Sequence, residues 1–195
     1  IRTDVALDEP AWGDAHRVAL DWEWFPAETA PAPVETEAYL TYDDANLYVC
    51  FRAHDTEPAA IRAHLMDRDE IDTLAQDDHV LLMIDTFNDE RRAFQFRVNP
   101  LGVQADAVFS ELDGIEDFSW DILWESAGRL TDSGWEVEIA LPMNQLRFPS
   151  GSAVQTWGFD IGRSYPRSVR HRIANTPRDR SNSCVLCQAA KITGF

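Results

Sequence analysis

Apolar and polar side chains alternate most regularly between residues 78 and 108. In the middle of this stretch Phe94, Phe96 and Val98 alternate with polar neighbours, and the segments on either side follow the same period of two. The turn sequences Asn-Asp and Asn-Pro-Leu-Gly separate the three segments. Alternation bounded by such residues is typical of antiparallel hairpins. The pattern therefore predicts three consecutive antiparallel strands.

Similar short segments recur along the chain at intervals of about 10 residues, as in β-sandwiches. Strands are expected at 16–25, 36–42, 47–53, 78–85, 93–99, 103–108, 120–127, 135–141 and 157–163. Short helical turns are expected at 58–65 and 142–146, and loops at 26–34, 66–76 and 111–117. The predicted fold is all-β, a single-domain antiparallel β-sandwich of the jelly-roll or immunoglobulin-like kind.

The domain is expected to span residues 1–163. The segment 164–195 holds many arginines and few large apolar residues, so it is expected to form a tail that wraps the surface or leads into a further domain. The chain begins with Ile1 instead of Met, as a processed or trimmed chain does.

Charge narrows the range of partners. The formal net charge is −17, which repels phosphate and makes a nucleic-acid partner or an anionic membrane surface unfavourable. Neutral ligands and cations remain compatible with this charge. An apolar run of the roughly 18 residues that a membrane helix needs does not occur in the sequence.

The three cysteines fall into two groups. Cys50 lies in a predicted strand and is expected to be a buried free thiol. Cys184 and Cys187 form a CxxC motif, but Gln188 stands where a haem-attachment motif has His, and a four-thiolate zinc site needs one more cysteine. A local disulfide in an oxidising compartment and two free thiols remain the alternatives.

Several segments together resemble a carbohydrate-binding module of family 9, in the version found at the start of outer-membrane proteins that continue into a β-barrel. The segments are Leu7-Asp-Glu-Pro-Ala-Trp12, Thr41-Tyr-Asp-Asp44, Leu47-Tyr-Val49, Arg68-Asp69, Asp77-Asp78, 85–106, Gly134-Trp135, Glu138-Ile-Ala-Leu-Pro142, Leu146-Arg-Phe148, Trp157-Gly158, Arg163-Ser-Tyr-Pro-Arg167, Cys184-Val-Leu-Cys-Gln188 and Thr193-Gly194-Phe195. Their order and spacing carry the resemblance across nearly the whole chain.

The resemblance implies a β-sandwich that binds an oligo- or polysaccharide, often with bound calcium, and has no catalytic activity of its own. It also implies a C-terminal β-barrel in the same protein. The expected location is therefore the periplasm or outer membrane of a Gram-negative bacterium.

Neutral sugars bind to flat aromatic faces while polar side chains meet their hydroxyls. Trp22 and Trp24 precede the proline-rich loop and are the first candidates for ligand binding. Trp120 and Trp124 are further candidates, with core packing as the favoured alternative because they share one strand face with Ile122 by alternation. Arg68 is a candidate donor to sugar hydroxyls, the favoured alternative being a salt bridge to Asp69 or Asp78.

Calcium binds six to eight oxygen ligands, mostly from carboxylates and carbonyls. Pairs of aspartates at predicted turns are the candidates, namely Asp85 with Asp89 and Asp43 with Asp44. The alternative for each pair is an acidic turn in contact with water.

Sequence motifs of common enzyme classes do not occur in the chain. It has no GxSxG, no HExxH and no glycine-rich phosphate loop, and its five histidines show no metal-binding spacing. Its 34 acidic residues make any proposed pair of glycosidase carboxylates arbitrary. The first functional hypothesis is a non-catalytic sugar-binding domain. The alternative is an interaction or gating domain that docks on its own β-barrel through the arginines after Ser164.

Overall fold

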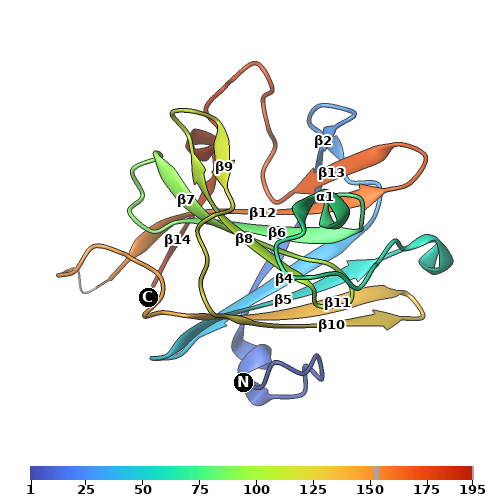
Figure 1. Cartoon of the computed structure of the whole chain (residues 1–195), viewed down its shortest axis with the longest axis horizontal. Coiled ribbons are helices and arrows are strands. Elements are labelled where there is room, and N and C mark those ends of the chain that lie inside the picture. Colours follow the sequence, from blue (N-terminus) through green and yellow to red (C-terminus); the bar gives the residue numbers. More distant parts are fainter. Residues whose placement is uncertain (152–153, 195) are drawn as a thin grey trace.

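Two antiparallel sheets form the fold of this computed structural model, which describes residues 1–151 and 154–194 (Figure 1). The five-stranded sheet has the order β1 (His16–Ala19), β4 (Thr36–Tyr42), β5 (Asn46–His54), β11 (Gly134–Pro142) and β10 (Glu125–Thr131). The nine-stranded sheet has the order β3 (Ala30–Pro31), β2 (Trp22–Phe25), β13 (Arg170–Ala174), β12 (Thr156–Pro166), β6 (His79–Asp85), β7 (Arg92–Val98), β8 (Gln104–Ser110) and β9 (Ile115–Asp117), with β14 (Ala190–Thr193) paired to β12. The predicted all-β antiparallel sandwich is confirmed.

Helical segments are short. They are η1 (Pro10–Asp14), η2 (Pro58–Ala60), α1 (Ile71–Leu74) and η3 (Leu186–Gln188). Within the described part of the chain, every helix is too short or too polar to cross a lipid bilayer.

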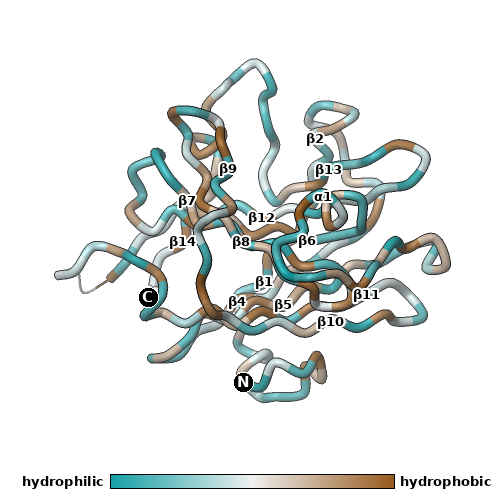
Figure 2. The backbone as a smooth tube through the Cα atoms, in the orientation of Figure 1, coloured by the Kyte–Doolittle hydropathy of each residue, from teal (hydrophilic) through white to brown (hydrophobic). Residues whose placement is uncertain are grey.

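The core fills the space between the two sheets. Both layers contribute fully buried side chains, among them Phe51 of β5, Val137 of β11, Leu82 of β6, Phe96 of β7 and Ile161 of β12. Figure 2 shows the hydrophobic residues along β5 and β11, whose alternate side chains face the other sheet. Burial of these alternate positions fixes the register, because a shift by one residue would turn the apolar set toward water.

Two predicted strands differ from the structure. The segment 16–25 is divided at Leu20 and Asp21, so that β1 joins one sheet and β2 the other. The segment 120–127 enters a strand only at Glu125. The residues before Glu125 cross from one layer to the other between β9 and β10 (Figure 1), and they alternate in burial without ladder pairing.

The predicted boundary between a domain at 1–163 and a tail at 164–195 falls inside a strand and is wrong at that position. Strand β12 continues to Pro166, and β13 lies between β12 and β2 within the nine-stranded sheet. The last strand, β14, pairs with the other end of β12. The segment after Ser164 is therefore part of the sandwich.

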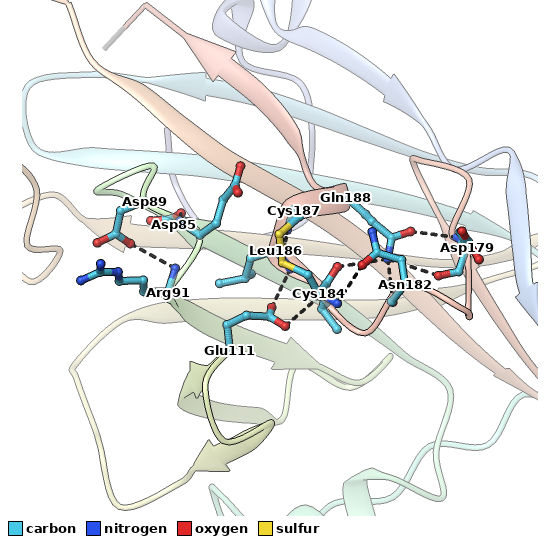
Figure 3. Close-up of a disulfide and its surroundings, with 12 residues drawn as sticks. Asp85, Asp89, Arg91, Glu111, Asp179, Asn182, Cys184, Leu186, Cys187 and Gln188 are labelled. Atoms are coloured by element: carbon cyan, nitrogen blue, oxygen red, sulfur yellow. Dashed lines mark hydrogen bonds between the residues drawn. A yellow bond between two sulfur atoms is a disulfide. The ribbon is translucent and has the colours of Figure 1, made fainter.

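A disulfide joins Cys184 and Cys187 in the loop between β13 and β14 (Figure 3). The Glu111 carboxylate accepts hydrogen bonds from the backbone N–H groups of Val185 (3.0 Å) and Leu186 (2.8 Å). Leu186 is buried in a small apolar cluster on the outer face of the nine-stranded sheet. These contacts fasten the disulfide loop to that face. The remaining cysteine, Cys50, is a buried thiol whose pKa is raised by its burial.

Candidate functional site

A cavity of about 460 Å³ lies on the face of the nine-stranded sheet that is turned away from the core. On β6, His79, Leu81 and Met83 line it, whereas the residues between them point into the core. On β7, Gln95 and Arg97 line it in the same alternating way. This cavity, named here the outer-face cavity, has the volume of a small-ligand site.

Segments far apart in the sequence form the walls of the outer-face cavity. Trp24 of β2 lines one side, Ile71 and Ala75 at α1 line another, and Val185 of the disulfide loop lines a third. Figure 1 shows α1, β2 and β13 gathered at the same end of the nine-stranded sheet. Gly162 lines the cavity on β12 and adds no side chain to it. The nonlocal strand pairing is therefore what assembles this cavity.

Two polar side chains within the cavity share one carboxylate oxygen. Gln95 donates through Nε2 to Oε1 of Glu116 (3.0 Å), and Arg97 donates through Nη2 to the same oxygen (2.6 Å). Gln95 is only 2% exposed, and its Oε1 is a buried acceptor without a hydrogen-bond partner among the described residues. The Nε of Arg97 is likewise a buried donor without such a partner. Groups of this kind gain free energy from any ligand that completes their hydrogen bonds.

Arginines dominate the charge of the cavity. The guanidinium groups of Arg172 and Arg178 lie over the Trp24 ring, with Cζ at 5.2 Å and 4.8 Å from its centroid. Arg178 forms an ion pair with Asp160, whereas Arg170 donates to the neutral Oε1 of Gln76 (3.2 Å). Burial lowers the pKa of Arg172, and the neighbouring Arg170 lowers it further.

The pKa of His79 is affected by the same positively charged arginines. Burial, together with the charge of Arg97, lowers its pKa to about 4. The unfolded chain therefore binds a proton at this site between about pH 6.5 and pH 4 while the folded chain does not, so this contribution to stability is lost as the pH falls through that window. We expect His79→Gln to remove roughly 2–3 kcal/mol of the acid-induced loss in the free energy of unfolding.

Urea unfolding of the wild type and the variant at pH 7 and pH 4.5 measures this difference. The matched control is His16→Gln, because His16 is exposed. Equal pH dependence in the wild type and His79→Gln would contradict the assignment of a neutral His79.

Of the four predicted tryptophans, Trp24 alone lines the outer-face cavity. Trp22 lies on the same strand opposite Pro31 and is partly buried away from the cavity lining. Trp124 is only 6% exposed, and its Nε1 donates to Oδ1 of Asp106 (3.1 Å). Trp120 stacks on Phe94 with ring centroids 4.8 Å apart. The structure thus places Trp120 and Trp124 against the core, because the chain before β10 covers the edge of the sandwich.

Arg68 lies in a network of carboxylates outside the outer-face cavity. Its guanidinium forms ion pairs with Asp106, with Asp121 (2.7 Å) and with Asp69 (3.3 Å), and it also donates to the carbonyl oxygen of Ile122 (2.5 Å). The salt bridge to Asp69 is the alternative that the sequence left open. The Nη2 group of Arg68 is thereby engaged within the protein.

Three of the four aspartates predicted as calcium ligands, Asp43, Asp85 and Asp89, accept hydrogen bonds within their turns. Both oxygens of Asp85 accept backbone N–H groups of the hairpin turn, at 3.2 Å and 2.8 Å, and Asp89 accepts one from Arg91 (Figure 3). Asp43 accepts hydrogen bonds from Ala45, Asn46 and Tyr48. Within the described residues, neither of the two groups of three close ligand atoms contains these four aspartates. Asp43, Asp85 and Asp89 shape turns, and calcium remains a prediction from the family resemblance alone.

Sequence reasoning missed most of the cavity-lining residues. Gln95 and Arg97 are the polar positions of the alternating pattern on β7, and this pattern alone marks them as outward-facing. Arg170, Arg172 and Arg178 were assigned to a tail, although Arg170 and Arg172 alternate with His171 and Ile173 as a strand does. A polar strand face that borders a cavity cannot be distinguished from a loop by hydropathy.

Comparison with known protein families and solved structures agrees with the antiparallel sandwich described above. The family model of the carbohydrate family 9 binding domain-like proteins matches residues 4–165. A carbohydrate-binding module of family 9 from Caldicellulosiruptor kristjanssonii has been solved with cellotriose and with glucose. These two structures cover 98% of this chain at TM-scores of 0.67 and 0.62 and identities of 16% and 15%, over 87% and 88% of their own lengths.

A putative carbohydrate-binding protein from Bacteroides uniformis covers 93% of this chain and 87% of its own length, with a TM-score of 0.70 and 13% identity. No curated protein matches the chain. At these identities the structural neighbours establish the shared fold, and the family model establishes membership. The chain belongs to the carbohydrate family 9 binding domain-like family.

Proposed function

We propose that this chain is a non-catalytic module that binds an oligo- or polysaccharide in the outer-face cavity. The observation that carries the proposal is a group of buried polar atoms without partners in residues that line this cavity, among them the Oε1 of Gln95 and the Nε of Arg97. Family membership supports it, as do the structural neighbours solved with cellotriose and glucose.

Sugar hydroxyls suit these two atoms because each hydroxyl both donates and accepts. A rotation of the two side chains toward the cavity would bring these buried atoms into reach, so that one hydroxyl donates to the Oε1 of Gln95 while a second accepts from the Nε of Arg97. The apolar groups beside them, Leu81 and Met83, offer a surface for the CH-rich face of a sugar ring. Trp24 lines the cavity from β2 and lies against the guanidinium groups of Arg172 and Arg178.

Calorimetry with glucose, cellotriose and xylotriose tests this function. We expect Gln95→Ala to weaken the binding of the best of these sugars about fivefold to tenfold, because one hydrogen bond contributes about 1 kcal/mol. Trp24→Ala is expected to weaken it by at least as much. Phe87→Ala is the matched control, since Phe87 is exposed on the β6–β7 hairpin and outside the cavity lining. Absence of binding to every sugar would contradict the proposal.

We also infer that the domain works outside the cytoplasm, in the periplasm or at the outer membrane of a Gram-negative bacterium. The Cys184–Cys187 disulfide supports an oxidising compartment. The alternative function, docking on a β-barrel of the same protein, was based on the arginines after Ser164. Because Arg167 pairs with Asp55 and Asp78 and three others line the outer-face cavity, that observation no longer favours docking.

A further inference from the structure

The outer-face cavity carries positive charge on a strongly acidic protein. The chain has a formal net charge of −17, yet the side chains of Arg97, Arg170, Arg172 and Arg178 line this one cavity. The acidic side chains in the lining are Asp72 and Glu116. Such a concentration of arginines within an acidic protein needs a local explanation.

The ion pairs of the described residues leave two of these arginines without acidic partners. Arg97 pairs with Glu116 (2.6 Å), and Arg178 pairs with Asp160. Arg170 has a neutral hydrogen-bond partner. Arg172 contacts the Trp24 ring and is attracted by the charge of Glu116, which already pairs with Arg97. The exposed Asp72 on α1 balances at most one of these two charges. The cavity therefore keeps a net positive charge close to its unpaired polar atoms.

Arginine is suited to bind an anionic group in this position. Its planar guanidinium donates two parallel hydrogen bonds to a carboxylate or a sulfate, and it is less strongly hydrated than a lysine ammonium. The Trp24 ring restricts the guanidinium of Arg172, which lowers the entropy cost of ordering it around a ligand. The overall negative charge of the protein disfavours ligands with the charge density of a nucleic acid, and is compatible with one anionic group on a sugar residue.

We propose that the outer-face cavity selects a sugar residue that carries an anionic group. Arg172, assisted by Arg170, holds the anion, while Gln95 and Arg97 hold the hydroxyls. This inference rests on the proposed function and narrows its substrate class from neutral to acidic glycans. A carboxylate at C6 and a sulfate ester share this recognition chemistry.

The test compares ligands that differ only in the anionic group. Affinities are measured by calorimetry in 20 mM and 150 mM salt for cellotriose and the β-1,4-linked glucuronic acid trisaccharide, and for glucose, glucuronate and glucose 6-sulfate. We expect the acidic trisaccharide to bind at least about tenfold more tightly than cellotriose in low salt, with a smaller preference in high salt. The monosaccharides show whether carboxylate or sulfate is preferred, and either preference over glucose supports the proposal.

Variants of Arg172 connect the preference to this side chain. We expect Arg172→Gln to reduce the ratio of the two trisaccharide affinities to below about threefold. Arg172→Lys is expected to restore part of this ratio, because lysine carries the positive charge but lacks the two parallel N–H donors of the guanidinium. Arg91→Gln is the matched control, since Arg91 is exposed and outside the cavity lining. Circular dichroism verifies that each variant is folded.

The outcomes separate the two proposals. Equal or tighter binding of the neutral sugars would overturn the inference while leaving sugar binding in place. An unchanged ratio in Arg172→Gln would overturn the role of Arg172. Binding of none of the sugars would overturn the proposed function itself, and binding of acetate as tight as that of glucuronate would show that the sugar is not recognised.

Discussion

Replacement of Arg163 with methionine is expected to lower the free energy of unfolding by about 3–5 kcal/mol, the cost of breaking a buried ion pair from one side. Arg163 is fully buried at the end of the sandwich. Its guanidinium donates to Oγ1 of Thr36 (2.9 Å) and to the carbonyl oxygen of His54 (2.8 Å), and its Nη2 lies 3.4 Å from Oδ2 of Asp55. One side chain of β12 thus connects the nine-stranded sheet to the ends of β4 and β5.

Methionine fills much of the same volume but supplies none of these donors. The buried Asp55 and Asp78 would retain Arg167 as their cation, and the carbonyl oxygen of His54 would lose its charged donor. Burial lowers the pKa of Arg163 to about 10, so the side chain still carries its charge at pH 7. Since a domain of this kind has a total stability of about 5–15 kcal/mol, the expected loss is a large fraction of it.

Urea unfolding at pH 7 measures this effect, with Arg129→Met as the control. Arg129 forms an ion pair with Glu136 (2.6 Å) on the exposed face of the five-stranded sheet, where such pairs contribute about 0–1 kcal/mol. If the free energy of unfolding fell by less than about 1 kcal/mol in Arg163→Met, Arg167 alone would be sufficient to neutralise Asp55 and Asp78. This result would contradict the prediction, which is based on the usual cost of breaking a buried ion pair.

Much of the architecture could be predicted from the sequence because alternation and turn chemistry act locally. The hairpin of β4 and β5 and the three strands β6, β7 and β8 were predicted within two residues of their bounds. In each of them one face is apolar and the other is polar, and the turn residues mark the ends. The alternation of apolar and polar residues shows which side chains are buried, but it does not show whether the backbone is hydrogen-bonded to a neighbouring strand. For this reason Trp120 and Trp124 suggested a strand where the chain crosses the edge of the sandwich from one sheet to the other.

The candidate site was far less predictable. Its residues come from β2, β6, β7, β13 and the disulfide loop, and their proximity depends on pairings between segments distant in the sequence. Trp24 was recognisable as a tryptophan beside polar residues. The arginines of β13 were not recognisable, because a strand with polar residues on its outer face resembles a solvated tail until its neighbours are known.

A second large effect is expected for Asp106, the buried carboxylate that holds the crossing segment before β10. Asp106 is 1% exposed; its Oδ1 accepts from the Nε1 of Trp124 (3.1 Å) and from Arg68, and its Oδ2 accepts from the backbone N–H of Ile122 (3.1 Å). Asp106→Ala would leave these donors without that acceptor in a dry environment. We expect the free energy of unfolding to fall by about 3–4 kcal/mol, since each buried donor left unpaired costs about 1–3 kcal/mol and Arg68 retains other carboxylates.

The comparison with two milder changes distinguishes hydrogen bonding from charge. Asp106→Asn keeps one carbonyl acceptor, and we expect its free energy of unfolding to fall by about half as much as in Asp106→Ala. Asp121→Ala removes a carboxylate whose side chain is 64% exposed, and we expect its free energy of unfolding to fall by less than about 1 kcal/mol. Urea unfolding followed by tryptophan fluorescence measures all three, and increased quenching by iodide in Asp106→Ala would show that the segment around Trp124 has come away from the core. If Asp106→Ala and Asp121→Ala lost equal stability, the network would act through its summed charge, and the crossing segment would be held by the packing of Ile122 and Trp124 alone.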